Sequence, residues 1–271
     1  MHLLVTGGTG YLGSELVRRA LATGWEVTGT GTRDFDVRDA GSVDLAFREL
    51  RPDAVVHTAY RQSGEGFLEI NRDGSRHVAR AAASAGARLV HLSTDVVFDG
   101  RRGGYREGEP VAPVTAYGAS KAEAEREVLA AHPDALVVRT SLLYGGTVPG
   151  THERLALEAA AGRSDVTFFT DERRNPTEVG DLAAALVELL PTARSGILHV
   201  AGADAVSRCE LARLFAGDRV RCGPSGDSRR PLDCTLALEE AQRLLRTPMR
   251  GARDVLAPKP GSGLAIQHFT K

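Results

Sequence analysis

The N-terminal segment constrains the fold more than any other part of the chain. His2 to Thr6 is a short apolar run typical of a buried strand, and the glycine-rich stretch GGTGYLG follows it. Leu12 to Ala22 then has the apolar spacing of an amphipathic helix. Strand, tight glycine turn and helix in this order are typical of a fold that binds a dinucleotide at the helix N-terminus. In this helix we expect four side chains to face the core: Leu12, Leu16, Val17 and Leu21.

The three spaced glycines have separate expected roles. Gly7 allows the turn, Gly10 lets the backbone approach a pyrophosphate, and Gly13 lets the helix pack closely on the strand. A GxxGxxG pattern also occurs in flexible loops, but its position directly after a strand favours phosphate binding. The cofactor-binding residues expected from this segment are Gly7, Thr9, Gly10, Tyr11 and Leu12.

Further apolar runs alternate with helical stretches along the chain. The runs are WEVTGT, AVVHTA, ARLVHLST and ALVVRTS, and the helices are expected at 43–50, 67–85 and 116–131. This alternation predicts an α/β fold with a doubly wound parallel (Rossmann) sheet and a smaller, discontinuous C-terminal substrate lobe. We expect a Rossmann domain over 1–145, with a return segment at about 176–201. The substrate lobe would comprise 146–175, with a helix at 153–161, and 202–271.

Composition excludes several classes of protein. A chain of 271 residues with 42% hydrophobic and 25% charged residues can bury a full α/β core. A net charge of −1 without a basic stripe argues against a nucleic-acid partner, and no apolar run approaches the roughly 20 residues that span a bilayer. Because the N-terminus is already a core strand, we expect no signal peptide. Cys209, Cys222 and Cys234 lack metal spacing and are odd in number, so we expect no metal and three reduced thiols in the cytoplasm. We expect a monomer or homodimer.

Tyr117 and Lys121 form a YxxxK pattern within a predicted helix. This spacing places a phenol and an ammonium on one helix face, where the ammonium is expected to lower the phenol pKa. Such a tyrosine exchanges a proton with a carbonyl or alcohol oxygen, and Thr94 supplies a second hydrogen-bond donor for that oxygen. Taken alone, YxxxK also fits a solvated helix face, and Ser93 and Thr94 also fit the cap of a strand end.

Five motifs in this order, GGTGYLG, HTAY, STDVVFDG, YGASK and RNPTEVGDLA, resemble the extended short-chain dehydrogenase/reductase family. STDVVFDG followed by YGASK is most similar to the dTDP-4-dehydrorhamnose reductase branch. The resemblance covers about 1–190 well and implies action on a nucleotide-activated sugar. It implies that Thr94 binds the substrate oxygen, that Tyr117 is the acid, and that Lys121 holds the cofactor ribose.

The same resemblance implies further contacts. Asn71 would hold a proton-relaying water near Lys121, although a helical asparagine bonded to neighbouring backbone fits equally well. Asp36 and Val37 would contact adenine, and Arg230, in RRPLDCTL, would lie near the sugar nucleotide. The remaining expected cofactor-binding residues, after the predicted third and fourth strands, are Thr58, Ala59, Tyr60 and Ser93.

The end of the second predicted strand indicates the cofactor. A fold that prefers NAD usually places a carboxylate there, but this chain has Gly31 followed by Thr32 and Arg33. Arg33 can pair with a 2′-phosphate, so we expect NADP (as NADPH). An offset of a few residues would bring Asp34 to the ribose, and NAD stays possible.

Two positions depart from the rhamnose-type pattern. Val96 replaces a tyrosine and Leu142 a tryptophan, and both are expected beside Asp95 in the substrate pocket. Val96 also replaces the glutamate of the dehydratases, which argues against water elimination. The sequence thus favours an NADPH-dependent reductase of a 4-keto, deoxygenated nucleotide sugar. A nucleotide-sugar epimerase with tightly bound NAD and a non-catalytic NADP-binding regulatory subunit remain alternatives.

Overall fold

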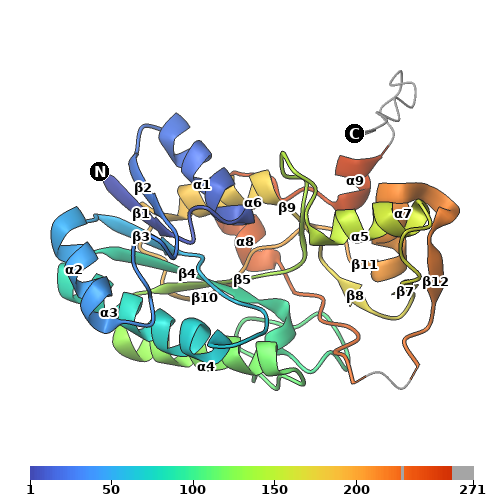
Figure 1. Cartoon of the computed structure of the whole chain (residues 1–271), viewed down its shortest axis with the longest axis horizontal. Helices are drawn as coiled ribbons and strands as arrows, with labels where there is room; N and C mark the ends of the chain where they lie inside the picture. Colours follow the sequence, from blue (N-terminus) through green and yellow to red (C-terminus); the bar gives the residue numbers. More distant parts are fainter. Residues whose placement is uncertain (227–228, 258–271) are drawn as a thin grey trace.

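A six-stranded parallel sheet forms the centre of the molecule (Figure 1). The computed structural model describes residues 1–226 and 229–257. The strand order is β10-β5-β4-β3-β1-β2, and every neighbouring pair is parallel. The strands are β1 (His2–Thr6), β2 (Glu26–Thr30), β3 (Ala54–His57), β4 (Arg88–Thr94), β5 (Leu136–Thr140) and β10 (Gly196–His199). The predicted doubly wound α/β sheet is therefore confirmed.

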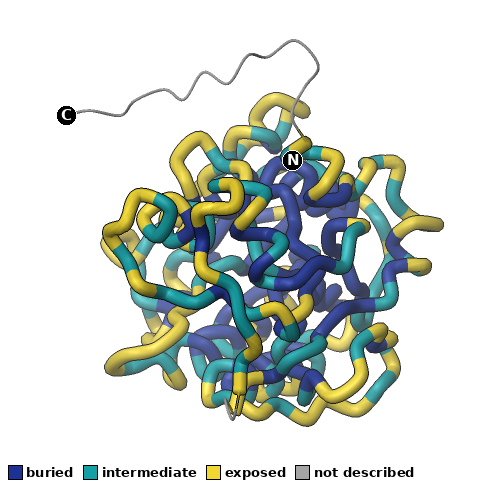
Figure 2. The backbone as a smooth tube through the Cα atoms, turned by 90° about the vertical axis from the view of Figure 1, so that its right-hand side faces the viewer, coloured by how far each residue is buried: buried dark blue, intermediate teal, exposed yellow. Residues whose placement is uncertain are grey.

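Helices cover both faces of this sheet because each strand is apolar on both sides. One face packs on α1 (Tyr11–Ala22), α6 (Val179–Leu189) and α8 (Glu239–Leu244), and the other on α2 (Ala40–Leu50), α3 (Ser75–Ala85) and α4 (Ala116–Ala131). Figure 2 shows the buried backbone concentrated inside a rim of exposed loops.

A second group of short elements lies beyond the carboxyl ends of the strands, on the right of Figure 1. It contains the helices α5 (Thr151–Ala160), α7 (Arg208–Ala216) and α9 (Ala252–Leu256). Its paired strands are β6 (Leu143–Tyr144) with β9 (Thr177–Glu178), β7 (Thr167–Phe169) with β12 (Arg221–Gly223), and β8 (Arg173–Arg174) with β11 (Val206–Ser207). Between these elements the chain returns to the central sheet as α6 and β10.

Two expectations about helices were wrong. Leu21 is 54% exposed, because the buried stripe of α1 follows Leu12, Leu16 and Ala20, and Leu21 lies about 100° round the helix from Ala20. The helix expected from residue 67 begins instead as a π-helical segment, η1 (Glu69–Gly74), which continues into α3.

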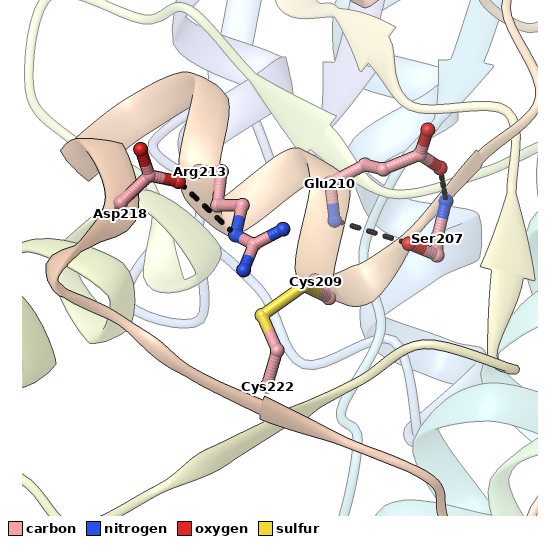
Figure 3. Close-up of a disulfide and its surroundings, with 6 residues drawn as sticks. All are labelled: Ser207, Cys209, Glu210, Arg213, Asp218 and Cys222. Carbon is pink, nitrogen blue, oxygen red and sulfur yellow. Dashed lines mark hydrogen bonds and ion pairs between the residues drawn. A yellow bond between two sulfur atoms is a disulfide. The ribbon is translucent and has the colours of Figure 1, made fainter.

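The thiol prediction was also wrong. Cys209 and Cys222 form a disulfide, because the pairing of β12 with β7 places Cys222 beside the first turn of α7 (Figure 3). Cys234 is a free, buried thiol. In the described part of the chain, no helix is both long and apolar enough to cross a membrane, and no cluster of His, Cys, Asp and Glu suits a metal ion.

Candidate active site

The glycine turn between β1 and α1 is closely packed. A Cβ on Gly13 would lie 2.1 Å from the Gly7 carbonyl oxygen, and one on Gly7, whose φ is +74°, would lie 2.8 Å from the Ala59 amide nitrogen. The first helical hydrogen bond runs from the Ser14 amide to the Gly10 oxygen at 2.9 Å, so the amides of residues 11–13 precede the helical bonding pattern. No acidic side chain lies in the first turn of α1. This turn suits a bound anion such as a diphosphate.

The side chain of Tyr11 points away from the turn. Its hydroxyl donates to Glu153 Oε2 at 3.1 Å and accepts from the Gly146 amide at 2.8 Å. Burial raises the pKa of Tyr11 to about 12. Tyr11 therefore links the glycine turn to the start of α5, and its hydroxyl is bonded within the protein.

The loop after β2 presents Arg33 to solvent. The Asp34 carboxylate accepts from the Gly31 amide at 2.7 Å, so this carboxylate is bonded within the turn that contains it. Asp36 pairs with the neighbouring Arg38, and Val37 is buried against Gly74, where a Cβ would lie 2.7 Å from Val37 Cγ2. The geometry thus leaves an exposed guanidinium, and no free carboxylate of Asp34, at the end of β2.

Tyr117 and Lys121 lie on α4, which begins with a side-chain cap. Thr115 Oγ1 accepts from the Gly118 amide at 3.0 Å, and this cap starts a helix with the predicted bounds. Lys121 is 3% exposed and its Nζ lies 3.3 Å from His91 Nε2. Burial lowers the pKa of Lys121 to about 8, while Glu125 acts in the opposite direction. The chain has three lysines among its 34 Lys and Arg, and only Lys121 lies within the described residues.

Tyr117 is close to both Thr94 and Tyr60. Its ring centroid lies 5.9 Å from that of Tyr60. Burial, followed by Tyr60 and Asp95, raises the pKa of Tyr117, and interaction with Thr94 opposes this rise. The expected lowering of the Tyr117 pKa by Lys121 is not observed. The Lys121 ammonium hydrogen-bonds to His91 in β4. The phenol therefore holds its proton at neutral pH, as a proton donor must.

Asp95, directly after Thr94, belongs to a buried polar group. It accepts from Ser141 Oγ at 2.6 Å and lies 3.5 Å from Arg174 Nε. Burial raises the pKa of Asp95, and Arg174 and Ser141 oppose this rise. Thr94 Oγ1 is 3.2 Å from Asp95 Oδ1, so the expected substrate-binding acid is also a neighbour that orients Thr94.

Two residues expected at the cofactor are engaged elsewhere. Ser93 Oγ donates to Glu125 Oε1 at 2.5 Å, and Glu125 forms a buried two-bond ion pair with Arg139. The Asn71 amide accepts from the Arg61 amide and donates to both the Arg61 oxygen and Ser120 Oγ, each at 2.8–2.9 Å. These bonds favour the structural interpretation of Asn71, because both amide hydrogens are used. The Ser93 side chain is likewise bonded within the protein, and a contact of Ser93 with the cofactor stays a prediction.

Other predicted residues lie around this centre. Thr58 Oγ1 donates to the Thr6 oxygen at 2.8 Å, and Ala59 contacts the glycine turn. Val96 packs against the apolar cluster around Phe98, whereas Leu142 packs against that around Tyr144. Val96 and Leu142 therefore pack on two different clusters, and their expected position beside Asp95 in the substrate pocket stays a prediction.

Basic side chains missed by sequence reasoning accompany Arg230. Arg230 donates to Glu172 at 2.9 Å, and Glu172 lies 3.4 Å from the buried Arg174. Arg208, at the first position of α7, lies 3.1 Å from His152 Nδ1. The Ser-x-x-Glu capping box at residues 207–210 marks the start of this helix in the sequence, but only the fold brings Arg208 to this group.

A family model described as the RmlD substrate binding domain matches residues 1–252. The chain belongs to the RmlD family. A dTDP-4-dehydrorhamnose reductase of Mycobacterium tuberculosis is 34% identical over 279 residues, covering 94% of this chain and 91% of that protein. A probable dTDP-4,6-dihydroxy-2-methyloxan-3-one 4-ketoreductase of Streptomyces antibioticus is 36% identical over 247 residues, covering 85% and 83%.

A solved structure extends the comparison across the whole RmlD fold. The dTDP-4-dehydrorhamnose reductase of Bacillus anthracis, in complex with NADP, has a TM-score of 0.85 and 26% identity to this chain. The match covers 94% of this chain and 95% of that one. The RmlD relationship therefore includes both the central sheet and the smaller group of elements.

Proposed function

We propose that this chain is an NADPH-dependent reductase that converts the 4-keto group of a nucleotide-activated deoxy sugar to an alcohol. The observation that carries the proposal is that Tyr117, one helical turn from Lys121, lies near Thr94 and Tyr60, while the neighbouring Ala59 packs against a glycine turn suited to a diphosphate. Relatives named as reductases of dTDP-activated keto sugars, and the NADP complex of the Bacillus anthracis protein, support the reaction and the cofactor.

The residues present fit a bound dinucleotide. The α1 amides and the glycine turn would hold its diphosphate, Arg33 its 2′-phosphate, and Lys121 its nicotinamide ribose. When bound, NADPH supplies the hydride that reduces the keto carbon.

The chain's own residues would supply the proton. Tyr117 donates its phenolic hydrogen to the substrate oxygen. The Thr94 hydroxyl, which donates to Asp95 Oδ1 at 3.2 Å in the structure, would redirect its single hydrogen to the same substrate oxygen. The ammonium of Lys121 stabilises the resulting tyrosinate from one helical turn away. Arg230 would bind the anionic part of the nucleotide sugar.

We also propose a division of the chain between these tasks. Residues 1–145 with 176–201 would bind NADPH, and 146–175 with 202–271 the sugar nucleotide. Of the latter, 227–228 and 258–271 lie outside the described residues.

Replacing the tyrosine tests the reaction. Tyr117→Phe keeps the ring but removes the proton, so turnover should fall by about 10² or more while folding and NADPH binding persist. Turnover is measured as NADPH oxidation with a 4-keto sugar nucleotide, and cofactor affinity by calorimetry. Lys121→Met should lower turnover and weaken NADPH binding. A Tyr117→Phe enzyme that reduces substrate at nearly the original rate would show that another group is the acid.

A further inference from the structure

A row of buried polar side chains crosses the sheet below the candidate active site. Thr6 pairs in register with His57, and His57 with His91, across β1, β3 and β4. All three are at most 1% exposed. Two residues earlier in each strand, Leu4, Val55 and Leu89 lie in the apolar core against α2, α3 and α4. The row therefore forms the polar upper edge of this core.

Hydrogen bonds determine the protonation of His57. Ser75 Oγ donates to the Asn71 oxygen at 2.6 Å, so it accepts from His57 Nε2 at 3.1 Å. Thr6 Oγ1 then donates to His57 Nδ1 at 2.6 Å. His57 is neutral with both ring nitrogens satisfied, in line with burial that lowers its pKa to about 3.

His91 is only half satisfied. Its ring stacks on His57 with centroids 5.3 Å apart, and its Nε2 lies 3.3 Å from Lys121 Nζ. An ammonium group can only donate, so Nε2 accepts and the ring proton lies on Nδ1. Nδ1 is buried without a partner among the described residues. An aliphatic side chain at position 91 would avoid this unsatisfied group, so packing alone does not explain the histidine.

We propose that His91 is a positioning residue for Lys121, with its Nε2 as the fixed acceptor that holds the lysine side chain on the sheet and favours its protonated form. The inference rests on the proposed function, in which protonated Lys121 stabilises the Tyr117 tyrosinate. Because His91 lies three residues before Thr94 in β4, one rigid strand then places both the lysine and the second donor to the substrate oxygen.

The other groups around Lys121 are committed elsewhere. Glu125, one turn further along α4, is bound to Ser93 and Arg139, and Asn71 to Arg61 and Ser120. His57 on β3 is saturated, and Tyr117 lies one turn earlier on α4. In the described chain, His91 is thus the acceptor available to the ammonium.

The small number of lysines makes a direct test possible. In protein labelled with ¹³C at lysine Cε, only three lysines contribute signals, and Lys121→Met identifies that of Lys121. His91→Gln places an amide oxygen near the position of Nε2, whereas His91→Asn places its amide near Nδ1, too short to reach Lys121. The two variants are therefore a matched polar pair.

We expect the Lys121 titration midpoint to fall by about one pH unit in His91→Asn and to stay within a few tenths of a unit in His91→Gln. The basic limb of the pH profile of kcat/KM should move with it. If His91→Asn and His91→Gln both fold and give the same Lys121 midpoint, the inference is wrong and His91 contributes only to packing. ¹⁵N spectra of the unaltered protein provide a test without any variant, because a His91 proton on Nε2 would also overturn the inference.

The titration uses the protein without substrate or cofactor, so its result does not depend on the reductase activity. It therefore distinguishes failure of the proposed function from failure of this inference. Reductase activity that survives in Tyr117→Phe and Lys121→Met would overturn the proposed function and leave the His91–Lys121 result standing. Activity lost in those variants, with a Lys121 midpoint insensitive to His91, would overturn this inference alone.

Discussion

Arg33 is the residue on which the cofactor assignment depends. It is exposed at the end of β2, while Asp34 is tied to Gly31. We expect Arg33→Ala to weaken NADPH binding about tenfold, equivalent to about 1.4 kcal/mol, because a charge-assisted contact with the 2′-phosphate is lost. NADH binding should be unchanged. Calorimetric titration measures both, with Arg126→Ala, an exposed arginine on α4, as control. Tighter NADH binding by the unaltered protein would contradict the assignment.

Val96 and Leu142 determine the expected substrate. Aliphatic side chains at these positions cannot hydrogen-bond a sugar hydroxyl. At each position, a sugar with a hydroxyl there loses about 0.5–1.5 kcal/mol of binding free energy. We expect a 2,6-dideoxy-4-keto sugar nucleotide to have a higher kcat/KM than dTDP-4-dehydrorhamnose. Val96→Tyr should shift this ratio back toward the rhamnose precursor. A clear preference of the unaltered enzyme for the rhamnose precursor would refute the pocket prediction.

Sequence spacing predicted Tyr117 and Lys121 because helical periodicity alone places them on one face. It did not predict the bonds of Ser93 and Asn71, since their partners Glu125 and Arg61 are distant in sequence and depend on how α4 and η1 dock. His91 and His57 were overlooked inside apolar runs. Their signal was a histidine in each of two otherwise buried strands, at positions that the register pairs.

At the scale of elements, the disulfide joins α7 to β12 across a sequence separation of 13 residues. The disulfide closes a loop of this size and so restricts the unfolded chain. Reduction of the disulfide should therefore lower the free energy of unfolding by about 2–4 kcal/mol. Urea unfolding with and without reductant measures the difference. The double variant Cys209→Ala/Cys222→Ala should be insensitive to reductant. If the unaltered protein is equally insensitive, the bond does not contribute in solution.

Helices with local sequence signals were predicted well, and long-range pairings were not. The helix at 116–131 has its predicted bounds, because a capping threonine and a run rich in the helix-forming residues Ala and Glu are both local signals. The pairing of Cys209 with Cys222 depends on β12 meeting β7, and no cysteine spacing encodes that contact. Since two of the three cysteines are paired, the thiol count no longer supports the cytoplasmic location, which stays a prediction.

The described part of the molecule contains three buried histidines and one partly buried histidine, His152, that stay neutral on folding. Burial lowers the pKa of His57 and His152 to about 3 and that of His199 to about 4, and lowers that of His91 as well. Below the unfolded value of about 6.5, the unfolded chain binds more protons than the native one, so stability falls as pH falls. Each histidine should lower the free energy of unfolding by about 1.4 kcal/mol for each pH unit that the pH falls between about 6.5 and 4.

Urea unfolding at pH 7.5 and 5.5 checks this expectation. The free energy of unfolding should be clearly lower at pH 5.5. In His152→Gln, the difference between the two pH values should be smaller by the contribution of one histidine. A free energy of unfolding that is the same at both pH values would show that the histidines are accessible to protons in the native state.

The return of the chain to the sheet as β10 also affects how the protein is synthesised. β5 ends at Thr140, but its outer neighbour begins only at Gly196, and the helix that covers α1, α6, lies in the intervening stretch. A ribosome must therefore synthesise the first part of the smaller group of elements, from β6 to β9, before the sheet acquires its last strand. Until then, β5 is an unpaired edge strand, and the apolar side of α1 that α6 later covers is exposed to solvent. Both surfaces can associate with other chains during synthesis.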